Sequence, residues 1–323
     1  MPRTRTLPPL FPALVACLAL AGCQRAVSDV APSSAPSPAV TGYTLSGRIS
    51  DPALDEISGI ALSRRDPGRL WAVNDGDNPA ELHLLEMEGR RVARFRLAGV
   101  RNVDWEDLAA FSWNGTPYLL VADIGDNSSR RVTVQLHLLV EPEVATGTVA
   151  GVGELRPVAT LRFRYPDGPR DAEGVAVDVP GGTILVLSKR ETEPRFYRLP
   201  LRLEWPAVPL VAEPVGRLQL DRPRFGPPSG PITRSLFGGS PTALDLDAAG
   251  RNLLLLTYTA VYRLQRQGQE SWAQALERPF AWLADHPLPQ AEALAVTPDG
   301  AQVHFTSERL PAPLWRLDLA NDR

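Results

Sequence analysis

Five segments of the chain begin with a polar opening and continue as a short run of small and apolar residues. The equivalent polar side chains are Ser58, Glu106, Glu173, Thr242 and Glu292, at intervals of 48, 67, 69 and 50 residues. Hydroxyl and carboxylate oxygens are the ligands that a hard cation such as Ca²⁺ prefers. If the fold brings the five together, the three carboxylates repel one another unless some are protonated or share a cation. The pattern therefore predicts a Ca²⁺ site at these residues.

A second set of polar side chains follows the first at a nearly constant distance. After 16 or 17 residues the chain reaches, in turn, Asp75, Asp123, Lys189, Tyr258 and Glu308. The start of one strand and the end of the next lie at the same edge of an antiparallel hairpin, so we expect this set around the Ca²⁺ site. The predicted catalytic residues are Asp75, Asp123, Lys189 and Glu308. An aspartate would orient water, and the single lysine would neutralise phosphate, as in metal-assisted hydrolysis.

The repeat that carries these residues indicates how the fold positions them. Each opening is followed by a turn sequence and a second apolar strand, predicted at 70–74, 118–122, 183–187, 253–257 and 303–306. Short strands that recur with a long period are typical of a β-propeller, in which the first strand of each blade lines a central channel. We predict an all-β, five-bladed propeller whose last blade is completed by segment 43–49. A six-bladed ring is the alternative, because the long loop at 221–239 leaves room for a different count.

The N-terminal 42 residues have the pattern of an export signal and a tether. Arg3 and Arg5 precede an apolar stretch at 7–20 that is too short to span a bilayer, and Leu-Ala-Gly then leads to Cys23. This pattern resembles a bacterial lipoprotein signal, so we expect removal of residues 1–22 and acylation of Cys23; an ordinary signal peptide is the alternative. Residues 23–42, rich in Ala, Pro and Ser, would tether a single domain, 43–323, to a lipid bilayer of the cell envelope. Gln24 favours the outer membrane, with the domain on its periplasmic or surface face.

Composition excludes several function classes. Cys17 and Cys23 are the two cysteines, so the predicted mature domain has no thiol for redox chemistry or nucleophilic catalysis. The four histidines are scattered singly, without the spacing of a zinc site, and we expect them to be strand residues. A net charge of −3 and the lack of a basic stretch with interleaved aromatic residues argue against a nucleic-acid partner.

Two resemblances follow from these residues. The order hydroxyl–Glu–Glu–hydroxyl–Glu, one per blade, resembles that of the secreted calcium-dependent apyrases, five-bladed propellers that bind a central Ca²⁺ and hydrolyse nucleotides. It implies Ca²⁺ ligation by the five ring residues and an acidic substrate turn at 74–78, although the Asp-Asp-Arg pattern of that family is missing there. Over most of its length, the chain resembles a family of bacterial β-propeller lipoproteins marked by Asp-Trp-Glu-Asp (104–107) and Asp-Ile-Gly-Asp-Asn (123–127).

Two functions are compatible with the sequence of this membrane-tethered propeller. One is a calcium-dependent phosphohydrolase that acts at the channel mouth on a phosphorylated small molecule such as a nucleotide or phytate. The other is a non-catalytic propeller that binds a protein or glycan of the envelope and whose ion is structural. The fold alone does not separate them.

Overall fold

The computed structural model describes residues 42–145, 151–222 and 238–319. All described residues belong to one compact unit, Val40–Arg323. Cys23 and the predicted signal lie outside the described residues, as does nearly all of the predicted tether. Among the described helices, none is long and apolar enough to cross a membrane.

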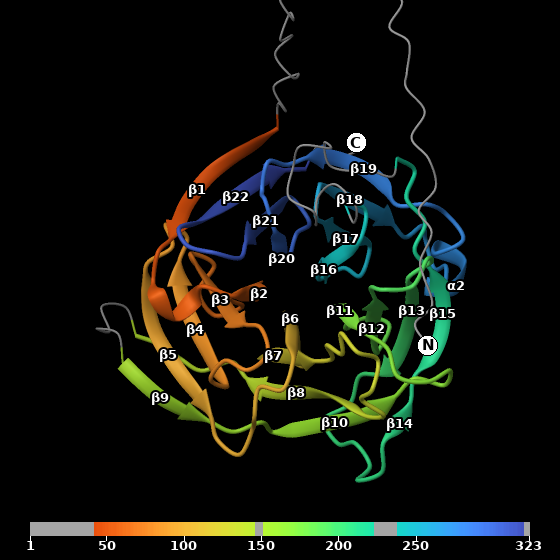
Figure 1. Ribbon diagram of the computed structural model, residues 1–323, viewed down its shortest axis with the longest axis horizontal. Coiled ribbons are helices and arrows are strands. Elements are labelled where there is room, and N and C mark those ends of the chain that lie inside the picture. The colour runs from red at the N-terminus through yellow and green to blue at the C-terminus, as the bar shows by residue number, and fades with distance from the viewer. Residues whose placement is uncertain (1–41, 146–150, 223–237, 320–323) are drawn as a thin grey trace, which may run out of the picture. The chain divides into compact units, whose positions relative to one another are not determined.

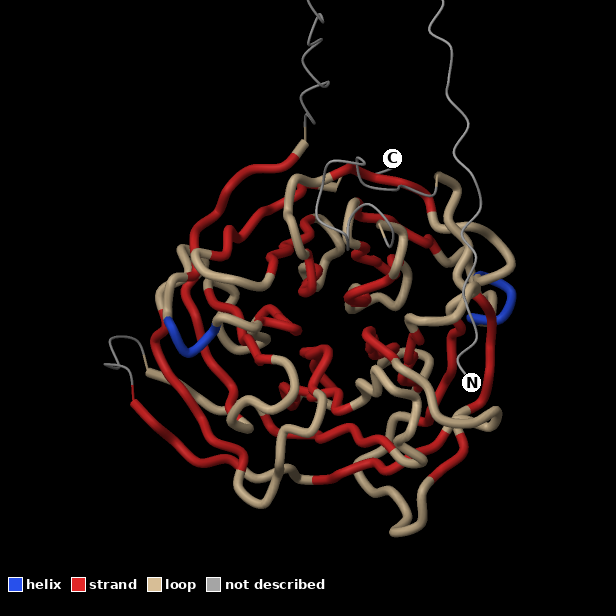
Figure 2. Tube along the Cα trace, viewed as in Figure 1, coloured by secondary structure: helices blue, strands red, loops and turns tan. Residues whose placement is uncertain are grey.

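The described strands form five sheets arranged as blades around a central axis (Figures 1 and 2). From the axis outward, blade 1 contains β2 (Ile57–Leu62), β3 (Arg69–Asn74), β4 (Glu81–Glu86), β5 (Arg91–Leu97) and β9 (Gly151–Leu155). Blade 2 contains β6 (Trp105–Trp113), β7 (Thr116–Asp123), β8 (Val134–Val140), β10 (Ala159–Arg164) and β14 (Leu210–Val211). Blade 3 contains β11 (Ala172–Asp178), β12 (Thr183–Ser188), β13 (Arg195–Pro200) and β15 (Glu213–Arg217).

The remaining two blades complete the ring. Blade 4 contains β16 (Pro241–Leu246), β17 (Asn252–Thr257), β18 (Ala260–Gln265) and β19 (Ala281–Asp285). Blade 5 contains β20 (Ala291–Val296), β21 (Gln302–Ser307), β22 (Ala312–Asp318) and β1 (Tyr43–Ile49). The helical segments described are a 3-10 turn (Pro52–Leu54) and α2 (Trp272–Ala275).

These sheets confirm the five-bladed propeller. Each innermost strand contacts the next around the axis, and β20 contacts β2, so the ring closes with five blades. The described chain between blades 3 and 4 adds β14 to blade 2 and β15 to blade 3, so it forms no sixth blade. β1 pairs antiparallel with β22, with Tyr43 opposite Leu317 and Ile49 opposite Ala312, so the predicted closure by the N-terminal strand is also confirmed.

Apolar layers between blades hold the ring together. Every residue of β2, β16 and β20 is buried. In β17, which reads Asn-Leu-Leu-Leu-Leu-Thr, apolar and polar residues do not alternate, because neighbouring blades cover both faces of the strand. The innermost strands have free edges toward the axis, and two buried aspartates bind N–H groups there. Asp107 of β6 accepts the N–H of Val175 at 2.8 Å and of Leu244 at 3.3 Å, which connects three blades. Asp245 of β16 accepts the N–H of Val296 in blade 5 at 2.8 Å.

Candidate metal centre

The five predicted ring residues share one backbone feature, a bulge near the start of the innermost strand. In every blade the register between the first and second strands shifts across the same position, which leaves one residue without a partner opposite. These residues are Ser58, Glu106, Glu173, Thr242 and Glu292. A bulge turns the side chain of its extra residue out of the regular alternation. All five side chains are buried.

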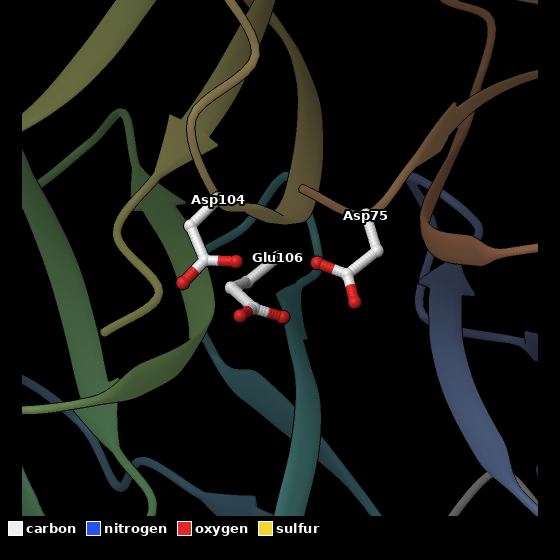
Figure 3. A group of neighbouring side chains, drawn as sticks. All are labelled: Asp75, Asp104 and Glu106. Atoms are coloured by element: carbon white, nitrogen blue, oxygen red, sulfur yellow. The ribbon is translucent and has the colours of Figure 1, made fainter. Parts of the chain in front are cut away.

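Two groups of neighbouring carboxylates lie at the end of the channel where the innermost strands begin, which we call the acidic mouth. Asp75, Asp104 and Glu106 each place a carboxylate oxygen within 4.8 Å of the others, and Figure 3 shows the three carboxylates directed toward one another. Glu106, Asp171 and Glu173 form a second group with the same spacing. Blades 1, 2 and 3 therefore supply an all-oxygen cluster that could hold a metal ion.

The carboxylates of the first group affect one another's protonation. Burial raises the pKa of Asp104 to about 7, and the charges of Asp75 and Asp171 contribute to the shift. Burial likewise raises the pKa of Asp75, with a contribution from Glu56. The pKa of Glu106 is well above its ordinary value because Glu106 is buried and faces Glu173 and Asp75. No described cation forms an ion pair with Asp75, Asp104 or Glu106, so a bound cation would relieve this repulsion.

Two carboxylates of the second group already form ion pairs with cationic side chains of the protein. Lys189 Nζ lies 2.8 Å from Glu173 Oε1 and 5.0 Å from the centre of the Tyr258 ring. Burial alone would lower the pKa of Lys189, but the charges of Glu173 and Glu292 outweigh it and raise that pKa well above its ordinary value. Asp171 accepts a hydrogen bond from Arg190 Nε at 2.6 Å. Lys189 and Arg131 also act on the first group, but no described cation lies within ion-pair distance of its carboxylates.

Two glycines let the backbone approach the first group closely. A Cβ at Gly76 would lie 2.6 Å from Asp104 Oδ1, and a Cβ at Gly125 would collide with the carboxylates of Glu106 and Asp104. The turns Asp-Gly-Asp-Asn and Asp-Ile-Gly-Asp-Asn therefore lie directly against the cluster, and a side chain at either glycine would displace its carboxylates.

The two hydroxyls of the ring provide an independent test of whether this site fits a metal ion. Ser58 Oγ and Thr242 Oγ1 are both buried and have no hydrogen-bond partner. An unsatisfied buried hydroxyl costs roughly 1–3 kcal/mol. A cation or its bound water between these hydroxyls and the carboxylates would remove that cost. The donor set is entirely oxygen, which suits a hard cation.

The structure gathers most, but not all, of the second predicted set at the acidic mouth. Asp75 joins the first carboxylate group, and Lys189 and Tyr258 lie beside Glu173. The carboxylate of Glu308 accepts a hydrogen bond from Gln290, and burial, assisted by Asp75, raises its pKa to about 7.

Asp123 belongs to neither carboxylate group. It lies directly opposite Trp105 in the β6–β7 pair, and its Oδ1 lies 2.5 Å from Arg131 Nη2. β6 has nine residues and β7 eight, whereas β2 and β3 have six each, so the return strand of blade 2 reaches the mouth later. Asp75 is the first residue after β3, and the first residue after β7 is Ile124. The constant spacing assumed from the sequence therefore placed Asp123 one residue too early.

Asp104 and Asp171 belong to the site although they were not among the predicted site residues. Each precedes a ring glutamate by two positions, as Asp-Trp-Glu and Asp-Ala-Glu. The available signal was this Asp-x-Glu spacing in two of the five openings, which keeps each aspartate close in sequence to a ring glutamate. The predicted strand position of the histidines holds for His83, His137 and His304, whereas His286 follows the end of β19 and contacts Thr257 O at 3.0 Å through Nε2.

No family model matches the chain, and no curated protein matches its sequence. A gluconolactonase from Xanthomonas campestris is 14% identical, and the match covers 82% of this chain and 72% of that one with a TM-score of 0.44. A luciferin-regenerating enzyme is 13% identical, and the match covers 83% of this chain and 80% of that one with a TM-score of 0.40. The β-propeller domain of Swd1 from Myceliophteria thermophila is 12% identical, and the match covers 82% of this chain and 84% of that one with a TM-score of 0.38. The resemblances to calcium-dependent apyrases and to β-propeller lipoproteins gain no support from these comparisons.

Proposed function

We propose that this propeller binds Ca²⁺ at its acidic mouth and hydrolyses a phosphorylated small molecule there. The observation that carries the proposal is the group of Asp75, Asp104 and Glu106, three neighbouring carboxylates with which no described cation forms an ion pair. Ser58 and Thr242 support it, because their buried hydroxyls lack a partner. The ligand set we propose combines Asp104 and Asp75 with the ring of Ser58, Glu106, Glu173, Thr242 and Glu292.

Calcium is the proposed ion because of the number and kind of donors. Ca²⁺ takes 6–8 oxygen ligands in flexible geometry, whereas Mg²⁺ requires a near-ideal octahedron and retains several waters. Neither carboxylate group contains a histidine or a cysteine. When bound, the ion supplies positive charge that offsets negative charge developing on a phosphoryl group.

The residues of the chain provide the other parts of a hydrolytic site. Glu308 is a half-buried carboxylate whose pKa burial raises to about 7, so it can accept a proton from water near neutral pH. Asp75 belongs to the ligand set and would orient that water. Lys189 is held against Glu173 and over Tyr258, which fixes its charge at the rim. We propose that Lys189 orients the substrate rather than reacts with it.

A non-catalytic role for the same site is the second candidate. The ion pair between Lys189 and Glu173 is buried and short, which leaves less positive charge for phosphate than the sequence suggested. In that case the ion would stabilise the ring, and the face of the propeller would bind an envelope protein or glycan.

Metal analysis combined with a phosphate-release screen tests the proposal. The purified full-length chain would be dialysed against Ca²⁺, analysed for bound metal and assayed with nucleotides and phytate. We expect one ion per chain and Ca²⁺-dependent release, both lost in Glu106→Gln and retained in the exposed control Glu213→Gln. Bound Ca²⁺ without release from any substrate would favour the structural role, and absence of bound metal would refute both candidates.

We also propose that Cys23 anchors the domain to a membrane of the bacterial envelope, which rests on the sequence pattern described above. Detergent-phase partitioning provides the test. Wild-type protein is expected in the detergent phase and Cys23→Ala in the aqueous phase or as uncleaved precursor. Equal partitioning of the two would exclude the lipid anchor.

A further inference from the structure

A second cavity lies at the end of the channel opposite to the acidic mouth. It has a volume of about 360 Å³ and is lined by the far ends of the innermost strands and the residues that follow them. All five blades contribute, for example through Leu62, Ala109, Val177, Leu246 and Thr297. The size falls within the range of small-molecule sites, and most of its lining is apolar.

Among the described residues, Arg64 is the one cationic side chain that lines this cavity. Its Nε donates to the carbonyl of Ala110 at 2.9 Å, whereas its Nη1 is buried and has no hydrogen-bond partner. A buried N–H of a charged group without a partner is costly, and an acceptor placed in the cavity would remove that cost. Burial lowers the pKa of Arg64, and the charges of Asp245 and Glu141 partly offset this effect.

The two carboxylates that line the cavity are occupied elsewhere. Asp245 accepts backbone N–H groups from Leu246 and Val296, both at 2.8 Å. Asp247 accepts the N–H of Arg251 and the side-chain amide of Asn252, both at 2.7 Å. Neither forms an ion pair with Arg64 within the described structure, so the guanidinium lacks a direct partner of opposite charge.

We propose that this cavity binds a small organic monocarboxylate, with the carboxylate at Arg64 and an apolar body between the blade ends. Charged hydrogen bonds to a guanidinium provide the polar contact, and the apolar lining favours an alkyl or aryl group over a sugar or a polyanion. The site is independent of the acidic mouth, because it shares no residue with it and lies at the other end of the innermost strands.

Hexanoate and its neutral analogue hexanamide are suitable probes, with binding to the full-length chain measured by calorimetry. We expect hexanoate to bind with a Kd of about 1 mM or tighter and hexanamide to bind at least about tenfold more weakly, since one charged hydrogen bond is lost. Arg64→Met should weaken hexanoate binding by a similar factor. The neighbouring Arg65 is exposed and does not line the cavity, so Arg65→Met is the matched control.

A second pair of variants keeps the test decisive if Arg64→Met does not fold. Ala248 is exposed and lines the cavity, whereas the adjacent Ala249 is exposed and does not. Ala248→Phe should abolish binding and Ala249→Phe should not. Chelation of metal and Glu106→Gln should leave hexanoate binding unchanged, which separates this site from the acidic mouth. Equal affinity for hexanoate and hexanamide, full binding by Ala248→Phe, or no saturable binding would each overturn the proposal.

Discussion

Replacement of Glu106 by Gln should have opposite effects on stability with and without calcium. Glu106 belongs to both carboxylate groups, in which oxygens approach within 4.8 Å. Because burial raises the pKa of Glu106, this repulsion acts only at a pH high enough to ionise it, so unfolding is compared under alkaline conditions. Two unit charges at that distance then repel by roughly 3 kcal/mol at an effective dielectric constant of about 20. Asp75 and Asp104 are half-exposed to solvent, so screening reduces this figure to about 1–2 kcal/mol.

In chelator, the amide removes part of this repulsion, so Glu106→Gln should unfold at a temperature a few degrees above the wild type. With calcium, the order should reverse. An ion that binds only the folded chain adds about 2.7 kcal/mol at a hundredfold excess over its Kd, which corresponds to roughly 5–10 °C for a domain of this size. The wild type gains this increment, and the variant loses most of it.

Thermal unfolding of four samples, each protein with chelator and with calcium, measures the effect. The exposed Glu213→Gln serves as the control for loss of one surface charge. A wild-type midpoint that does not change with chelator would exclude a removable ion. A variant destabilised equally in both conditions would show that Glu106 acts through packing, and the electrostatic reasoning would be refuted.

Two further predictions concern the turns and the pH dependence of stability. Gly125→Ala should abolish the calcium response, because its Cβ collides with the Glu106 carboxylate, whereas Gly68→Ala, whose nearest contact is 3.4 Å away, should retain it in the same thermal assay. Burial lowers the pKa of His83, His137 and His304 to about 4. The unfolded chain takes up these protons near pH 6.5 and the folded chain does not, so stability should fall between pH 6.5 and about 4. Each histidine contributes about 2 kcal/mol at pH 5, and urea unfolding of His304→Gln should show a flatter pH profile; an unchanged profile would contradict this.

The repeat explains why the fold and the ring residues could be predicted from sequence. Every blade uses the same first hairpin, so five weak strand signals reinforce one another, and the observed second strands lie within two residues of the predicted ones. Ser58, Glu106, Glu173, Thr242 and Glu292 align because each occupies the same bulge. Because the bulge recurs in every blade, the polar residue at that position recurs in the sequence, although the sequence does not reveal the bulge itself.

Features that differ between blades could not be predicted in this way. The longer β6–β7 hairpin moves Asp123 away from the carboxylate groups, and it extends to the two-residue turn Asn114-Gly115, far from the mouth. Asp104 and Asp171 come from two blades only, so they have no repeat to identify them. The proximity of Asp104 to Glu106 is accompanied by the close approach of Gly76 and Gly125, where a Cβ would meet these carboxylates.

The location of the ion also depends on this asymmetry. A symmetric ring would place a cation on the axis, at equal distance from all five blades. Lys189 breaks the symmetry because its ammonium group lies against Glu173 and its charge also acts on Glu292. Arg190 engages Asp171 in the same half of the mouth. The carboxylates without a cation at ion-pair distance are Asp75, Asp104 and Glu106, so within the proposed ligand set we expect the ion to lie nearer to these three than to Glu173 and Glu292.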